Sequence, residues 1–144
     1  MADTKISALT DAGAMAGDEV MPIVQSSATK KAKARDVAKI GYQDIQTVSA
    51  ATKTLALTDR GSWMRFTATN TLTVPTNASV AFAIGEMLNG VQAGTGQVTI
   101  AAASGVTINR PASTNAKTRV QGSAFSLIKV ATDTWDLVGD LEAV

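Results

Sequence analysis

The chain contains neither cysteine nor histidine among its 144 residues. Without cysteine it has no disulfide framework and no thiolate metal site. Without histidine it lacks the usual general base near neutral pH and the commonest zinc ligand, which excludes every catalytic triad built on that residue. We therefore expect a protein that is not an enzyme, with no catalytic, cofactor-binding or metal-binding residue and no cofactor.

Aromatic residues are also scarce, at 4% of the chain, although 45% of the chain is hydrophobic. Such a core consists mainly of small and β-branched side chains, which bury little area each, so self-association is expected to add stability. No apolar run reaches the length of about 18 residues that a membrane-spanning helix needs. The net charge of +1 gives no overall field for nucleic acid. Neither a membrane nor nucleic acid is an expected partner.

Residues 1–41 have the pattern of an extended attachment arm rather than of a folded unit. An apolar strand is predicted at Glu19–Gln25 and a second strand, in which Ala alternates with Lys, at Thr29–Ala34. The polar turn Ser26–Ala28 joins them, and a helical turn at Asp36–Ile40 closes the arm. Because a lone two-stranded hairpin is marginal in water, this one must pack against the rest of the chain or another subunit.

Two sets of arm residues are candidates for docking on a larger assembly. The apolar set is Val20, Ile23 and Val24, and the basic set is Lys31, Lys33 and Arg35. Basic residues could also contact phosphates, but no aromatic residue is interleaved with them to stack on bases. We interpret them as the solvated face of a strand or a contact with an acidic neighbouring protein.

Residues 42–53 have weak helical spacing without caps and are predicted to be a linker. From residue 54 to residue 144, apolar residues recur at period two, as in half-buried strands. The clearest alternations are Met64 with Phe66, Leu72 with Val74, Val80 with Phe82 and Ile84, Val98 with Ile100, and Val106 with Ile108.

Turn signals separate these strands at short intervals, among them Asn89–Gly90 and Gly94–Gly96. The last two strands are predicted at Ala124–Ala131 and Thr134–Gly139, joined by a tight hairpin at Thr132–Asp133. Short strands between frequent turns favour a mainly β protein whose compact domain is an antiparallel sandwich or barrel.

Large side chains are so few that each is expected to anchor the core or a subunit contact. These candidates are Trp63, Phe66, Phe82, Phe125 and Trp135. The carboxylates Asp133 and Asp136 flank Trp135, and we interpret them as solvated turn residues rather than as the paired carboxylates of a glycosidase.

Two stretches of the sequence resemble bacteriophage structural proteins. ISALTDAGAMAGDE, the strand VMPIVQ and the following TKKAKARDV are similar to the start of many tail-fibre and appendage proteins. A small β-module of phage virion proteins is similar to three further segments, LALTDRGSWMRFT, LTVPTNASVAFAIGEMLNGVQAGTGQVTIAAASGVTINR and SLIKVATDTWDLVGDL.

The resemblance implies a structural component of the virion, a short fibre, appendage or adaptor protein that forms a homotrimer and binds other phage structural proteins of the capsid or tail. A full fibre continues into a long shaft and a receptor-binding tip, which this sequence does not show. A capsid decoration protein that stabilises the head shell is therefore the alternative, and a glycan-binding module is a second one.

Overall fold

The computed structural model describes residues 20–25, 28–33 and 43–144. The chain divides into two compact units, Met1–Tyr42 and Gln43–Val144. In the first unit, β1 (Val20–Gln25) pairs antiparallel with β2 (Ala28–Lys33), as expected for the predicted hairpin. The predicted helical turn at residues 36–40 lies outside the described residues. The part of the chain that the structure describes has no helix long and apolar enough to cross a membrane.

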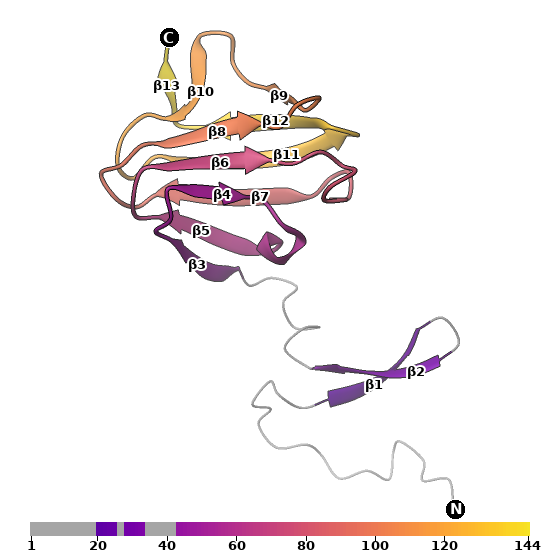
Figure 1. The fold of residues 1–144 in the computed structure, drawn as a ribbon. Coiled ribbons are helices and arrows are strands. Elements are labelled where there is room, and N and C mark those ends of the chain that lie inside the picture. Colours follow the sequence, from indigo (N-terminus) through magenta and orange to yellow (C-terminus); the bar gives the residue numbers. More distant parts are fainter. Residues whose placement is uncertain (1–19, 26–27, 34–42) are drawn as a thin grey trace, which may run out of the picture. The chain divides into compact units, whose positions relative to one another are not determined.

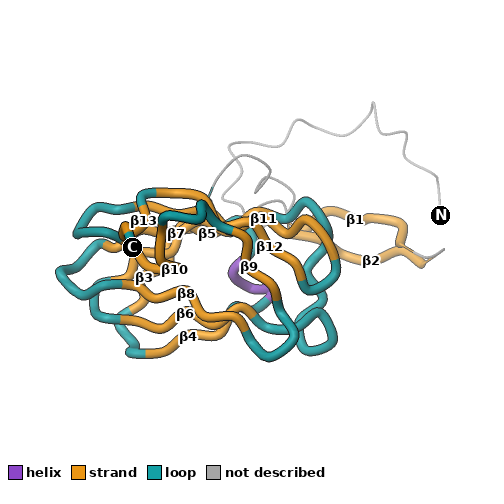
Figure 2. Tube along the Cα trace, turned by 90° about the horizontal axis from the view of Figure 1, so that it is seen from above, coloured by secondary structure: helices purple, strands orange, loops and turns teal. Residues whose placement is uncertain are grey.

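The second unit consists of two sheets (Figures 1 and 2). The six-stranded sheet has the order β3 (Asp44–Val48), β5 (Ser62–Phe66), β7 (Met87–Gln92), β11 (Ala124–Ala131), β12 (Thr134–Gly139) and β9 (Thr107–Asn109). The five-stranded sheet has the order β13 (Leu141–Ala143), β10 (Thr114–Thr118), β8 (Val98–Ala102), β6 (Asn70–Val74) and β4 (Thr52–Thr54). A 3₁₀ turn, η2 (Leu57–Asp59), follows β4. The predicted fold class, mainly β with a sandwich-like domain, is confirmed.

The chain winds between the two sheets from β3 to β8. Strands β3, β5 and β7 enter the six-stranded sheet, and β4, β6 and β8 alternate with them in the five-stranded sheet. Figure 2 shows β4, β6 and β8 side by side in one layer. Each strand lies beside the one added a full turn earlier, so these neighbours run parallel, as in a short β-solenoid.

The expectation of a wholly antiparallel domain is corrected by this winding. Antiparallel pairing is confined to the C-terminal part of the domain, where β11 joins β7 and β12, and β10 joins β8 and β13. Strand β9 is parallel to β12. Tight turns can connect only antiparallel neighbours, whereas from β3 to β8 each connection passes to the other sheet before the chain returns.

The core lies between the facing sides of the two sheets. Strand β6 contributes the buried Leu72 and Val74, and β11 contributes Phe125 and Leu127, in the alternation that the sequence predicts. The rings of Phe66 and Phe125 have centroids 6.0 Å apart. Gly90 makes this packing possible, because a Cβ there would lie 2.6 Å from the Cζ atom of Phe125.

Three sequence expectations are corrected by the described residues. The expected linker at 42–53 contains β3 and β4, whose inward positions carry the polar Gln46 and Lys53 and so hide the alternation. Residues 80–84 form no strand; they lie in a loop, from which Phe82 packs into the core. Asn89–Gly90 lies within β7 rather than in a turn. The predicted final hairpin is confirmed, with strands Ala124–Ala131 and Thr134–Gly139 paired across Thr132–Asp133.

Candidate functional site

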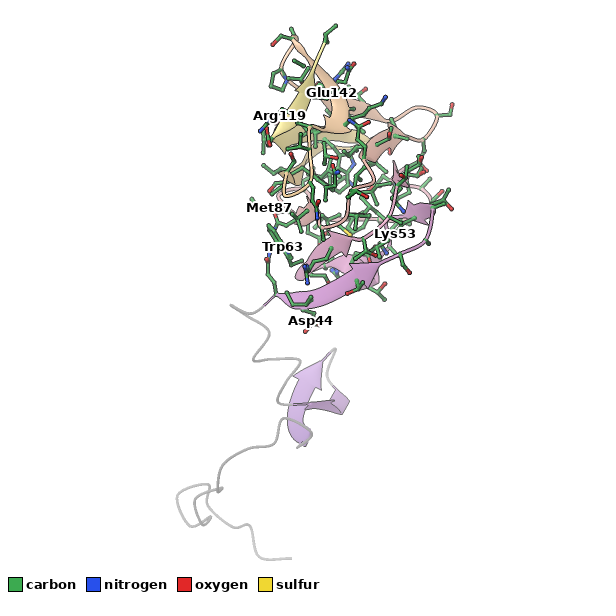
Figure 3. The ribbon with its side chains drawn as sticks, turned by 90° about the vertical axis from the view of Figure 1, so that its left-hand side faces the viewer. Asp44, Lys53, Trp63, Met87, Arg119 and Glu142 are labelled. Atoms are coloured by element: carbon green, nitrogen blue, oxygen red, sulfur yellow. The ribbon has the colours of Figure 1, made fainter. Side chains whose placement is uncertain are left out.

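The outer face of the six-stranded sheet carries a row of side chains in direct register across five strands. The row runs Ile45, Trp63, Asn89, Ser126, Val138. Ile45 is 66% exposed and Val138 is 48% exposed, and Trp63 is partly exposed between them. In Figure 3, Trp63 and Met87 lie along one side of the domain and Lys53 lies toward the other. The apolar residues of this row, with Met87 and Ile128, are called the outer apolar face.

Trp63 stands beside a hollow of about 200 Å³ on the same face. The hollow is lined by Trp63, Ala124, Phe125, Ser126, Val138 and Gly139. Small residues form it because Ser126 and Gly139 carry little or no side chain between the larger Trp63 and Val138. The Ser126 hydroxyl is held down by its 2.6 Å hydrogen bond to Asn89 Oδ1. A partly exposed indole and a hollow thus lie side by side on one face.

A second register row on the same face contains Met87, Ile128, Asp136 and Asn109. Met87 is 52% exposed. Asp136 accepts a 2.8 Å hydrogen bond from Asn109 Nδ2 at the far edge of the sheet. Arg65, on β5, provides a positive charge on the same side of the sheet as Trp63. The face therefore combines exposed apolar side chains with the hydrogen-bonded Asn89 and Ser126 between them and with charges of both signs.

The five aromatic candidates separate into two groups. Phe66, Phe82, Phe125 and Trp135 are buried in the core, and Trp63 lies on the outer apolar face. Phe82 and Trp135 meet edge to face, with ring centroids 5.4 Å apart and an angle of 83° between the ring planes. The sequence did not separate these roles, because in an aromatic-poor chain each aromatic residue is expected to anchor either the core or a subunit contact.

Of the arm candidates, Val20, Ile23 and Val24 lie on β1, and Lys31 and Lys33 lie on β2. The register pairs Val20 with Lys33 and Ile23 with Lys30. Arg35 lies outside the described residues. The apolar set and two of the three basic residues thus lie on one hairpin.

Sequence reasoning missed Ile45, Met87 and Val138 as members of an exposed face. Val138 could have been found, because it follows Leu137 in a strand whose other face carries Trp135 and Leu137. Ile45 could not have been found in this way, because it lies in the segment 42–53, whose sequence predicts a linker.

The edge of the domain at β3 and β4 carries a polar cluster around Asp59. Asp59 is buried, and its Oδ1 accepts hydrogen bonds from Lys53 Nζ at 2.9 Å and from Gln46 Nε2 at 3.0 Å. Its Oδ2 accepts a 2.9 Å hydrogen bond from the Ala56 backbone. These contacts close the core at its first winding and leave no oxygen of the carboxylate without a partner, so the cluster is structural. Among the described residues no group of acidic side chains could hold a metal ion.

A second ion pair lies where β12 passes into β13. Arg119 donates to both carboxylate oxygens of Asp140, at 2.7 and 2.9 Å, and Ser123 donates to the same carboxylate at 2.7 Å. The hydrogen bonds from Arg119 and then from Ser123 hold the pKa of Asp140 below its usual value. The hydrogen bond to Asp140 likewise raises the pKa of Arg119. The pair joins the segment that follows β10 to the segment between β12 and β13.

Comparison with known proteins adds no assignment to this geometry. No protein-family model matches the chain, and no curated protein matches it.

Proposed function

We propose that the chain is a structural protein of a bacteriophage particle, a short fibre, appendage or adaptor component that assembles through its β domain and docks through its N-terminal arm. The outer apolar face carries the self-association part of this proposal. The resemblance of residues 5–40 and of the β-module to phage appendage proteins supports the virion part. The protein works by burying complementary surfaces, and a homotrimer is the expected assembly.

A second copy of the chain is the occupant that best suits the outer apolar face. The Trp63 ring of each copy can occupy the hollow of the other copy. Arg65 and Asp136 supply opposite charges on the same face. Tryptophan is one of the residues that most often dominate the energy of an interface. The hollow beside Trp63, at about 200 Å³, is smaller than the pockets of about 300–1,000 Å³ that usually hold small molecules, which favours a protein partner.

Self-association is tested by measuring the molar mass of the full chain by light scattering over a range of concentrations. The wild-type chain is expected to be oligomeric, and Trp63→Lys is expected to shift dissociation to at least about thirtyfold higher concentration. Thr99→Lys is the matched control, because Thr99 lies on β8 in the other sheet and is partly exposed. A monomeric wild type, or an oligomer that Trp63→Lys leaves intact, would overturn the proposed surface.

The virion role is tested on purified particles with antibodies against the β domain. Immunogold labelling at the tail, with a few tens of copies per particle, would support the appendage role. Labelling over the head with hundreds of copies would replace it with the decoration alternative. Absence of the chain from particles would overturn both, and turnover of host polysaccharide by the purified chain would favour the glycan alternative.

A further inference from the structure

Lys129 is a buried lysine in the core of the β domain. It lies on β11 in the same alternation as Phe125 and Leu127, so its side chain points between the sheets, and only 2% of it is exposed. Its Nζ lies 5.9 Å from the centroid of the Trp135 ring. The Phe82 carbonyl oxygen accepts a 2.7 Å hydrogen bond from it.

Among the residues that the structure describes, no carboxylate forms an ion pair with this buried group. The described part of the chain has ion pairs at Lys53, Arg60 and Arg119, and Lys129 is in none of them. Burying an ammonium without a counter-ion costs several kcal/mol, so proteins retain such a group only where it has a use or where its charge is removed.

The amine nitrogen is placed against the side-chain amide of Asn77. Lys129 Nζ is 2.5 Å from Asn77 Oδ1, which is shorter than an ordinary hydrogen bond between these groups. Because Oδ1 is one bond from Cγ, the amine is already next to the amide carbon. The two residues are 52 positions apart in the sequence.

Two further contacts hold Asn77 in place. Its backbone N–H donates to Asp133 Oδ1 at 2.5 Å, from the turn between β11 and β12. The turn around it is closed by hydrogen bonds from the Ser79 and Val80 backbone to the Thr76 carbonyl, at 3.1 and 3.0 Å. Asp133 adopts a φ of 54°, in the left-handed region, and this backbone orientation accompanies the contact of its carboxylate with the asparagine backbone.

We propose that Lys129 and Asn77 form an intramolecular isopeptide bond, which makes Asn77 a modification site that joins the two sheets. The site combines a buried amine, a side-chain amide in contact with it, and a carboxylate that holds the backbone of the same asparagine. The inference is independent of what the protein docks on.

The reaction needs no external reagent. One proton first leaves Nζ, and the lone pair that this frees attacks Asn77 Cγ and forms the new C–N bond. The carbonyl electrons move to Oδ1 and return, and the bond from Cγ to Nδ2 breaks. Lys129 enters as an ammonium with three protons and ends as an amide with one. The two protons that it loses pass to Nδ2, which leaves as ammonium. Asp133 is a positioning residue, because its carboxylate accepts the hydrogen bond from the Asn77 backbone N–H and so fixes the asparagine.

The bond would link two parts of the domain that are far apart in the chain. Asn77 follows β6 of the five-stranded sheet, and Lys129 is on β11 of the six-stranded sheet. Joining them would close a covalent loop around the core and replace an uncompensated buried charge with a neutral amide.

The test is the intact mass of the full chain under denaturing conditions, followed by tryptic mapping. The expected mass is lower than the sequence mass by one ammonia. The map should contain residues 66–117 joined to residues 120–144, with no cleavage after Lys129. A chain at full sequence mass would overturn the proposal whether or not any variant folds.

Variants separate this ammonia loss from cyclisation at Asn89–Gly90, which releases ammonia as well. Lys129→Arg and Asn77→Ala are expected to restore full mass, whereas the matched controls Lys117→Arg and Asn89→Gln should keep the loss. Asp133→Asn is expected to slow bond formation in freshly made protein without changing the final linkage site. An ammonia loss that persists in Lys129→Arg would overturn the assignment.

Discussion

The carboxylate of Asp59 lies 2.9 Å from the ammonium group of Lys53, and both side chains face the core side of the first winding. Asp59 is 1% exposed and is also bonded to Gln46 and to the Ala56 backbone. One residue therefore satisfies three donors from three different segments at the edge of the domain.

Asp59→Ala is expected to lower the free energy of unfolding by about 3–5 kcal/mol, because it leaves a partly buried lysine end and two further donors without a partner. Lys53→Met should cost less, since it removes the cation and keeps an apolar stem of similar length. Urea unfolding followed by circular dichroism measures both, with the exposed neighbour Thr58→Ala as control. A smaller loss in Asp59→Ala than in Lys53→Met would contradict this account.

Gly90→Ala is expected to destabilise the domain by about 1–3 kcal/mol through overpacking, because its Cβ would meet Phe125 Cζ at 2.6 Å. The clash is with the end of a ring, so Phe125→Leu in the same chain should relieve part of it. A double-mutant cycle on unfolding free energies would show this as a coupling between the two sites. Strictly additive effects would mean that the ring is not what excludes a side chain at position 90.

Asp140→Asn is expected to reduce stability at neutral pH and to have no effect in acid. The hydrogen bonds from Arg119 and Ser123 lower the pKa of Asp140, so their contribution is complete above the ordinary aspartate pKa of about 3.9 and disappears as the pH falls through the lowered value. Urea midpoints measured against pH test this. Arg119→Gln should show the same convergence with wild type, and a difference that persists undiminished in acid would count against the pair.

Removal of residues 1–42 is expected to leave the β domain folded, because every residue of its buried core lies between Val48 and Leu141. The truncated chain should unfold cooperatively with a midpoint close to that of the full chain, and it should fail to enter phage particles. Removal of residues 1–19 alone, which leaves the β1–β2 hairpin, is the control. Normal incorporation of the chain that lacks residues 1–42 would show that the arm is not the attachment element.

Local patterns in the sequence predicted the strands whose core side is apolar. Leu72 with Val74 and Phe125 with Leu127 gave their strands directly, and the hairpin at Thr132–Asp133 followed from two adjacent strands and a short turn. The pattern failed where polar residues face inward. With Gln46 and Lys53 at inward positions, β3 and β4 have the sequence pattern of a linker. These two polar side chains can face inward only because they bond to Asp59, which comes from another segment.

The sequence by itself determined that this chain is mainly β, poor in aromatic anchors and without cysteine or histidine chemistry, since composition and period-two alternation are properties of each short segment. Only the tertiary structure decided which strands are neighbours and in which direction they run, because alternation specifies the buried side of a strand but not its partner. It also decided that Trp63 faces outward while Trp135 is buried, and that Lys129 meets Asn77. Contacts between residues 52 positions apart exist only once both sheets have closed over the core.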